Sequence, residues 1–179
     1  MEQDQPSISI RLARASEAEA IASAILQSFV EYRASYTPDG FAVTTPAADT
    51  IRGRLHEGPV WVARRQDVIV GTVSAAPKGA ACYVRSMAIV PAARGLGLGR
   101  LLLERVEAFA ASQGHTYLLL STTPFLARAI RLYEQVGFRR TADGPHDLYG
   151  TALFTMVKPL AGDDHRPPTT DQRPPTTDQ

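Results

Sequence analysis

The stretch that decides the fold of this 179-residue chain is Arg94-Gly95-Leu96-Gly97-Leu98-Gly99-Arg100. It follows a run typical of a β-strand, residues 83–90, and precedes a segment whose apolar periodicity predicts a helix up to residue 113. Glycine at every second position removes the Cβ atoms that would keep the backbone from turning sharply and lying against a ligand. The N–H groups of such a bend, with the positive end of the following helix, suit a phosphate or a pyrophosphate. The arginines at its two ends add positive charge.

Glycine spacing alone does not identify a phosphate site, because tight turns before helices often carry glycine and bind nothing. A Walker loop has Lys and then Ser or Thr after its last glycine, whereas Gly99 is followed by Arg100 and Leu101. The dinucleotide fingerprint GxGxxG has its third glycine later than this chain does. A nucleotide-binding domain is therefore the weakest of the functions considered.

The bend resembles the acyl-CoA-binding motif of the GNAT superfamily of N-acetyltransferases, written Q/R-x-x-G-x-G/A. A second segment, residues 129–138, is similar to the "A..LYE..GF" signature of the same family. Two motifs in the right order are more specific than either alone, and the resemblance covers residues 7–160. The matching residues are Met87–Pro91 before the bend, Arg94, Gly97 and Gly99 within it, and Ala129–Glu134, Gly137 and Phe138 after it.

The resemblance implies a mixed α/β fold of the α+β type. Its central sheet is twisted and mostly antiparallel, is flanked by four helices, and splays between strands four and five to admit the pantetheine arm. The sequence itself gives the order β, α, α, β, β, β, α, β, α, β, β. The expected strands are residues 8–13, 60–64, 68–74, 83–90, 117–121, 138–141 and 150–158.

Capping residues predict where the helices begin. Ser16 with Glu19 reads as a capping box for the first helix, and Pro46 suits the first position of the second. Thr123 and Pro124 would open the last helix. The segment Pro38–Gly40 is typical of a turn.

Length and composition predict one compact domain, residues 1–160, since 44% of the chain is hydrophobic. The net charge of +1 argues against nucleic-acid or membrane binding driven by bulk charge. A polar N-terminus, the lack of a long apolar run and a lone cysteine lead us to expect a cytoplasmic protein. Residues 161–179, which contain RPPTTDQ twice, have little to bury and are expected to be a disordered tail.

The resemblance also implies a reaction and the residues that carry it. Acetyl-CoA would be the co-substrate, and a primary amine would attack its thioester directly. Backbone N–H groups of the central strand, at Met87, Ala88 and Ile89, would bind the thioester oxygen. The coenzyme diphosphate would lie on Arg94, Gly95, Leu96, Gly97, Leu98, Gly99 and Arg100.

Tyr133 is the expected general acid for the departing thiolate. A phenol titrates near 10 and a thiol near 8.5, so full proton transfer is uphill by about 2 kcal/mol in water. The contribution should therefore be modest, with the phenol mainly donating a hydrogen bond to the sulfur. The alternative is that Tyr133 is a packed aromatic residue of an amphipathic helix.

The sequence does not decide which group removes the proton of the amine as the general base. Many GNAT proteins place a glutamate on the central strands, where this chain has Tyr83, Arg85 and Ser86. Glu31, His146, Asp147 and a water chain are the candidates. The family often has asparagine where Leu126 stands, so one contact to the coenzyme is expected to be absent.

Four aromatic residues indicate where the acceptor amine would bind. The resemblance places the acceptor site of GNAT folds in the region that holds Phe29, Tyr32, Tyr36 and Phe41. They would shape an apolar slot or simply pack in the core. The function expected is an N-acetyltransferase acting on a small-molecule or peptide amine, as a monomer or a homodimer. No metal is expected. The alternative is a noncatalytic acyl-CoA-binding module that has lost its base.

Overall fold

Eight strands and five α-helices alternate along residues 7–160, the part of the chain that the computed structural model describes. The strands are β1 (Ile8–Leu12), β2 (Val60–Arg65), β3 (Val68–Lys78), β4 (Ala81–Ile89), β5 (Tyr117–Thr122), β6 (Arg139–Arg140), β7 (His146–Leu148) and β8 (Thr151–Pro159). The helices are α1 (Ala18–Phe29), α2 (Pro38–Thr44), α3 (Ala48–Glu57), α4 (Leu98–Ser112) and α5 (Ala127–Gln135). The predicted tail, 161–179, lies outside the described residues.

The sheet has the strand order β1-β2-β3-β4-β5-β8-β6, and β7 pairs with β8. Neighbours are antiparallel except β4 and β5, which are parallel and pair only over Ala81–Tyr83 and Tyr117–Leu119. Because β4 continues to Ile89 without pairing further with β5, the two strands part beyond Tyr83. The expected mixed, mostly antiparallel sheet that splays between strands four and five is confirmed.

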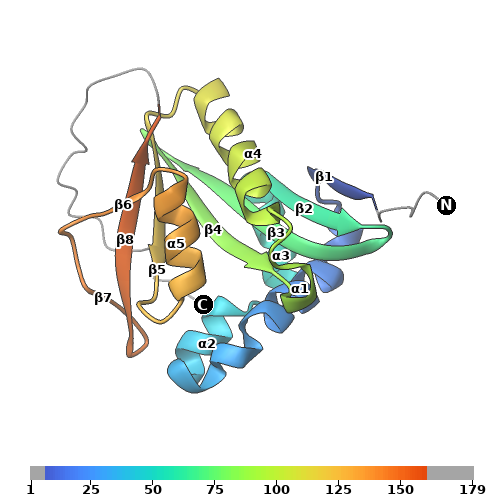
Figure 1. Ribbon diagram of the computed structural model, residues 1–179, viewed down its shortest axis with the longest axis horizontal. Helices are drawn as coiled ribbons and strands as arrows, with labels where there is room; N and C mark the ends of the chain where they lie inside the picture. The colour runs from blue at the N-terminus through green and yellow to red at the C-terminus, as the bar shows by residue number, and fades with distance from the viewer. Residues whose placement is uncertain (1–6, 161–179) are drawn as a thin grey trace.

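Helices cover both faces of the sheet, with α4 and α5 in front and α1 and α3 behind in Figure 1. On α4 the apolar side chains of Leu98, Leu102 and Val106 are buried, while Gln113 just after the helix is exposed. Behind the sheet, Ile21 and Ile25 of α1 pack with Ile51 of α3. The two layers hold the ends of β4 and α4 in fixed positions.

Five helices stand where four were expected, because the predicted turn at Pro38–Gly40 begins a helix. Thr37 caps it by accepting a hydrogen bond from the Gly40 N–H at 3.1 Å, and Pro38 supplies the first position. The Thr37 hydroxyl also donates to the Tyr149 carbonyl at 2.7 Å, so a contact distant in sequence fixes this short helix. Strand β7 was also missed.

The predicted helix starts were wrong in their details. The capping box does not form at Ser16 and Glu19, since α1 begins at Ala18 after a 3-10 turn. Glu17 is the N-cap residue of α1, and its Oε2 accepts the Arg14 N–H at 2.8 Å, which caps the preceding 3-10 turn. Helices α3 and α5 begin two and three residues after the predicted prolines, at Ala48 and Ala127.

The two terminal nitrogens of the Arg11 guanidinium donate hydrogen bonds to the two carboxylate oxygens of Glu17, at 2.6 and 2.9 Å. This pairing lowers the pKa of the Glu17 carboxyl from 4.5 to about 2, with the Arg14 N–H contributing. Glu17→Gln should lower the free energy of unfolding by about 1 kcal/mol at pH 7. Because the folded-state pKa is depressed, the stabilisation is complete above pH 4.5 and is lost as the pH falls towards 2.

Urea unfolding of the wild type and Glu17→Gln at pH 7, 4 and 2.5 checks this expectation. The gap between the two proteins should shrink on acidification. A gap that stays constant with pH would show that the carboxylate charge does not matter.

Two further observations concern the reactivity of the cysteine and the length of the helices. Cys82 is buried in β4, and burial raises the pKa of its thiol to about 11, so it is a core residue and not a reactive thiol. Within residues 7–160 no helix has the length and apolar content needed to span a membrane.

Candidate active site

A cavity of about 470 Å³ lies between the end of β4, the glycine bend, α5 and the end of α1. It brings together nearly all the residues singled out from the sequence. Those that line it are Met87, Ala88, Ile89, Arg94, Gly95, Gly97, Leu98, Gly99, Arg100 and Tyr133. Leu96 is the exception, since it does not line the cavity and its side chain is 46% exposed.

The three glycines of the bend have two different roles. Gly95 and Gly97 have φ angles of +81° and +73°, and a Cβ at either position would meet no atom within 4 Å. They give the turn its left-handed conformation and leave open space on the cavity side. Gly99 is helical, and its Cβ would lie 2.5 Å from Leu132 Cδ2 of α5. The lack of a side chain at Gly99 therefore lets α5 pack closely against α4, and Gly99 also lines the cavity.

Helix α4 begins directly at the cavity. Its N-cap is Gly97, which carries no side chain to cap the first turn, and the first intrahelical bond runs from the Leu101 N–H to the Gly97 carbonyl at 3.2 Å. The N–H groups before Leu101 therefore have no helical acceptor. With the helix dipole they favour an anion at this end of the cavity.

Arg94 is tied to the helix behind it. Its guanidinium pairs with Glu31 at 2.5 Å and donates to the Ser28 carbonyl at 3.1 Å. The charge of Arg94 is thus partly neutralised, and the side chain fixes the bend to the end of α1. Glu31, one candidate base, is committed to this ion pair.

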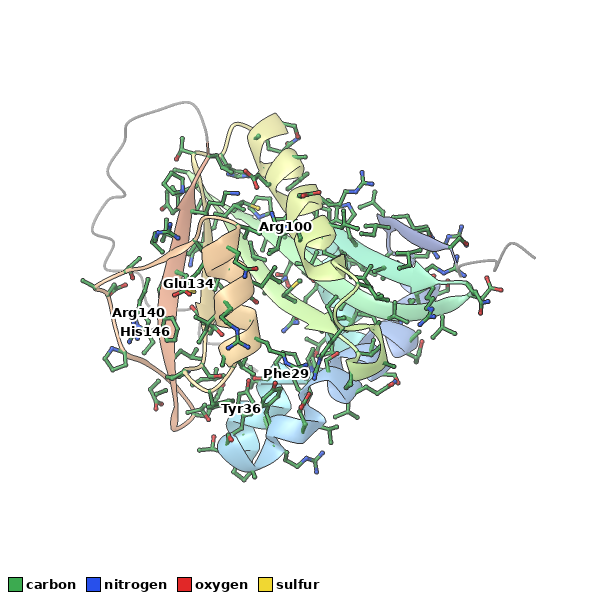
Figure 2. All side chains as sticks on the ribbon, in the orientation of Figure 1. Phe29, Tyr36, Arg100, Glu134, Arg140 and His146 are labelled. Carbon is green, nitrogen blue, oxygen red and sulfur yellow. The ribbon has the colours of Figure 1, made fainter. Side chains whose placement is uncertain are left out.

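Three other arginines supply uncompensated positive charge. Arg100 of α4, labelled in Figure 2, lines the cavity together with Arg128 and Arg131 of α5, and all three are exposed. None of the three forms an ion pair within residues 7–160. The mouth of the cavity is therefore positive and suits several phosphate groups. Arg128 and Arg131 were not predicted from the sequence as residues of the coenzyme site, although their spacing of three places both on one side of a helix.

A β-bulge interrupts β4 where it enters the cavity. Thr72 pairs with Ala88 and Ser74 with Arg85, so Ser86 and Met87 together face the single residue Val73. Ser86 has a φ of +51°, which is rare for a residue with a side chain. Such a bulge leaves one residue outside the ladder, with backbone groups free for a ligand. No glycine marks the bulge, so it could not be predicted from the sequence.

Tyr133 lies at the inner end of the cavity with a side chain that is 6% exposed. Its ring packs against Phe138 at 5.8 Å between centroids. Burial raises the pKa of its phenol far above the ordinary value, and nearby Tyr83 and Tyr36 add to the shift. The hydroxyl forms no hydrogen bond with any residue of the described part of the chain. The phenol is therefore a neutral donor on a residue that lines the cavity.

The predicted aromatic set divides between the two roles considered. Phe29 and Tyr32 line the cavity, whereas Tyr36 and Phe41 are buried and pack edge to face at 5.9 Å. Phe125, which the sequence reading did not single out, joins them 4.8 Å from Tyr36. Figure 2 shows Phe29 and Tyr36 at the end of the molecule where α5 begins.

The remaining base candidates lie on β7, away from the cavity lining. Both carboxylate oxygens of Asp147 accept the Gly150 N–H, at 3.0 and 3.1 Å, which fixes a turn. His146 lies 3.5 Å from Asp143. Among residues 7–160, no three His, Cys, Asp or Glu side chains come together in a way that could hold a metal ion.

Comparison with known proteins agrees with this geometry. Residues 24–138 match the model of the acetyltransferase (GNAT) family. An IAA acetyltransferase of Azospirillum brasilense is 40% identical over 102 residues, which are 55% of this chain and 66% of that protein. The N-acetyltransferase YjgM of Escherichia coli (strain K12) is 34% identical over 127 residues, 66% of this chain and 74% of that protein.

The fold has counterparts among solved structures. The acetyltransferase yncA of Salmonella typhimurium, solved with acetyl-CoA, superposes with a TM-score of 0.69 at 24% identity, covering 88% of this chain and 95% of that one. The fold is therefore that of this solved acetyltransferase, and the glycine bend, the end of β4 and Tyr133 line one cavity in it. The chain belongs to the GNAT family of acetyltransferases. Acetyl-CoA is the co-substrate that this membership brings with it.

Proposed function

We propose that the protein transfers the acetyl group of acetyl-CoA to a primary amine of a small molecule or a peptide. The observation that carries this proposal is the joining, in one cavity, of the glycine bend, the bulge of β4 and the Tyr133 phenol. The bend and α4 would hold the diphosphate through backbone N–H groups, with Arg100, Arg128 and Arg131 around the phosphates.

The reaction would proceed by direct attack. The amine nitrogen bonds to the thioester carbon, and the carbonyl oxygen becomes an oxyanion that backbone N–H groups at the Met87 bulge stabilise. The C–S bond then breaks, the electron pair goes to sulfur, and the amine proton leaves. Tyr133 donates a hydrogen bond to the thiolate, since its raised pKa makes complete proton transfer more costly than in water.

We assign no side chain to the removal of the amine proton. The cavity lining within residues 7–160 contains no Asp or Glu. A water chain to solvent is our proposal, and it favours amines of lower pKa: an amine near 8 costs about 1.4 kcal/mol to be neutral at pH 7, against about 4.6 kcal/mol for a lysine side chain.

The test is acceptor-dependent release of free thiol from acetyl-CoA. The assay should cover polyamines, amino acids, aminoglycosides and peptide N-termini, with mass spectrometry of the acetylated product. We expect at least one acceptor to raise thiol release well above the acceptor-free rate.

The missing carboxylate favours one second candidate, a noncatalytic acyl-CoA-binding module. Such a module would bind acetyl-CoA in calorimetry and show no acceptor-dependent thiol release with any amine. The cytoplasmic location and the monomer or homodimer state stay predictions, which cell fractionation and sedimentation would check.

A further inference from the structure

A second group of charged side chains lies on the face of β4 that α1 and α3 cover, behind the coenzyme cavity. Arg54, in the last turn of α3, donates from its guanidinium to the Ser86 hydroxyl in the bulge of β4. Arg85, on the same strand, pairs with Glu57 at the end of α3. None of these four side chains lines the coenzyme cavity.

The two arginines have more positive charge and more donors than their protein partners use. Arg54 and Arg85 carry +2 together and Glu57 carries −1, which leaves one net positive charge. Of the five N–H donors of Arg54, only the one to Ser86 has an acceptor within residues 7–160. The Nε of Arg85 is buried and also lacks a hydrogen-bond partner there. The Arg54 guanidinium thus has donors free for an acceptor from outside residues 7–160, and the buried Arg85 Nε would gain from one, since a buried donor without an acceptor is costly.

Charge and burial support the same interpretation. Burial, and then the charge of Arg85, lower the pKa of Arg54 to about 10, so the guanidinium stays protonated at neutral pH. An anion bound here would relieve the repulsion between the two arginines. A single carboxylate would match both the net charge of +1 and the planar fork of a guanidinium.

The group lies next to the place where acetyl transfer would occur. Ser86, which Arg54 contacts, directly precedes Met87 in the bulge, and Met87 lines the coenzyme cavity. The Tyr83 phenol is close enough to both Arg54 and Tyr133 for its charge to shift the pKa of each. Tyr83 belongs to β4, the strand that also carries Arg85, Ser86 and Met87. An anion on Arg54 would be part of the molecule whose amine reaches the thioester.

We propose that Arg54, supported by Arg85, binds a carboxylate of the acceptor, so that the acceptors are amines that also carry a carboxylate, such as amino acids. This inference rests on the proposed acetyl transfer and narrows its substrate class. It assigns Arg54 to acceptor binding and not to the chemical step.

The experiment measures thiol release with matched acceptors: the twenty amino acids, their amides, the decarboxylated amines and phosphoethanolamine. The wild type should use at least one amino acid with a kcat/KM about tenfold or more above that of its amide and amine. Arg54→Gln should lower kcat/KM for that amino acid by about ten- to a hundredfold, mainly through KM. Arg54→Lys should recover part of the loss, and values for the amide should stay unchanged.

Arg52→Gln is the matched control, since Arg52 belongs to the same helix but pairs with Glu19 and Asp49 at the surface. It should leave acceptor kinetics unchanged, and both Gln variants should bind acetyl-CoA like the wild type in calorimetry. The inference is overturned if amides or decarboxylated amines are used as well as the acids, or if phosphoethanolamine is preferred. It is also overturned if Arg54→Gln lowers all acceptors equally, or if no carboxylate-bearing amine is acetylated.

Calorimetry separates these failures from failure of the proposed function. If acetyl-CoA binds and a simple amine is acetylated, only the acceptor class is wrong. If acetyl-CoA does not bind, or binds without any acceptor turning over, the acetyltransferase proposal fails together with this inference.

Discussion

Tyr133→Phe is expected to lower kcat by about ten- to a hundredfold while acetyl-CoA binding stays nearly unchanged. The variant loses one hydrogen bond to a sulfur that becomes negative as the C–S bond breaks, and a bond to a charged group is worth about 1.5 to 3 kcal/mol. Folding should be preserved, because the ring contact with Phe138 at 5.8 Å remains and the hydroxyl has no partner within residues 7–160. Steady-state thiol release and thermal melting measure the two quantities.

The pH dependence adds a second readout. Since burial raises the pKa of Tyr133, the phenol stays protonated, and the kcat ratio of wild type to Tyr133→Phe should be constant from pH 7 to about 10. Tyr117→Phe, on β5 and outside the cavity lining, is the control and should change nothing. An unchanged kcat in a folded Tyr133→Phe protein would mean that Tyr133 only packs in the core.

Gly97→Ala is expected to weaken acetyl-CoA binding by about ten- to a hundredfold. The φ of Gly97 is +73°, and the residue lines the cavity where we propose that the diphosphate lies, so a methyl group there would compete with the coenzyme for space. Alanine also disfavours this left-handed conformation by about 1 kcal/mol, so the N-cap of α4 should lose some of its shape. Isothermal titration calorimetry gives the change in Kd.

Gly114→Ala separates the two causes of that loss. Gly114 follows the other end of α4 with a φ of +77° and also has open space at its Cβ, but it does not line the cavity. The two variants should lose similar stability, whereas only Gly97→Ala should lose affinity for acetyl-CoA. Equal Kd values for both variants would remove the glycine bend from the proposed binding site.

Local backbone chemistry explains why much of the site was predictable from sequence. Gly95 and Gly97 adopt positive φ because of their own lack of a side chain, and the strand before them and the helix after them follow from short-range patterns. Ten of the eleven predicted site residues line one cavity for this reason, with Leu96 the exception. The splay of the sheet followed from the family resemblance, and the pairing of β4 with β5 confirms it.

Contacts between distant segments explain what the sequence could not give. Thr37 caps α2 partly through bonds to residues more than 110 positions away, so Pro38–Gly40 alone reads as a turn. Gly99 is required by Leu132 of α5. The pairing of Arg94 with Glu31 and of Arg54 with Ser86 depends on how the helices pack on the sheet. None of these partners is close in sequence.

Calorimetric titration of acetyl-CoA into the 179-residue protein tests most directly whether the cavity at the glycine bend binds this coenzyme. A single saturable site with a Kd between about 1 µM and 1 mM is predicted, and unlabelled coenzyme A should compete for it. No heat at millimolar acetyl-CoA with a folded protein, or displacement of the coenzyme by equimolar ATP, would contradict it.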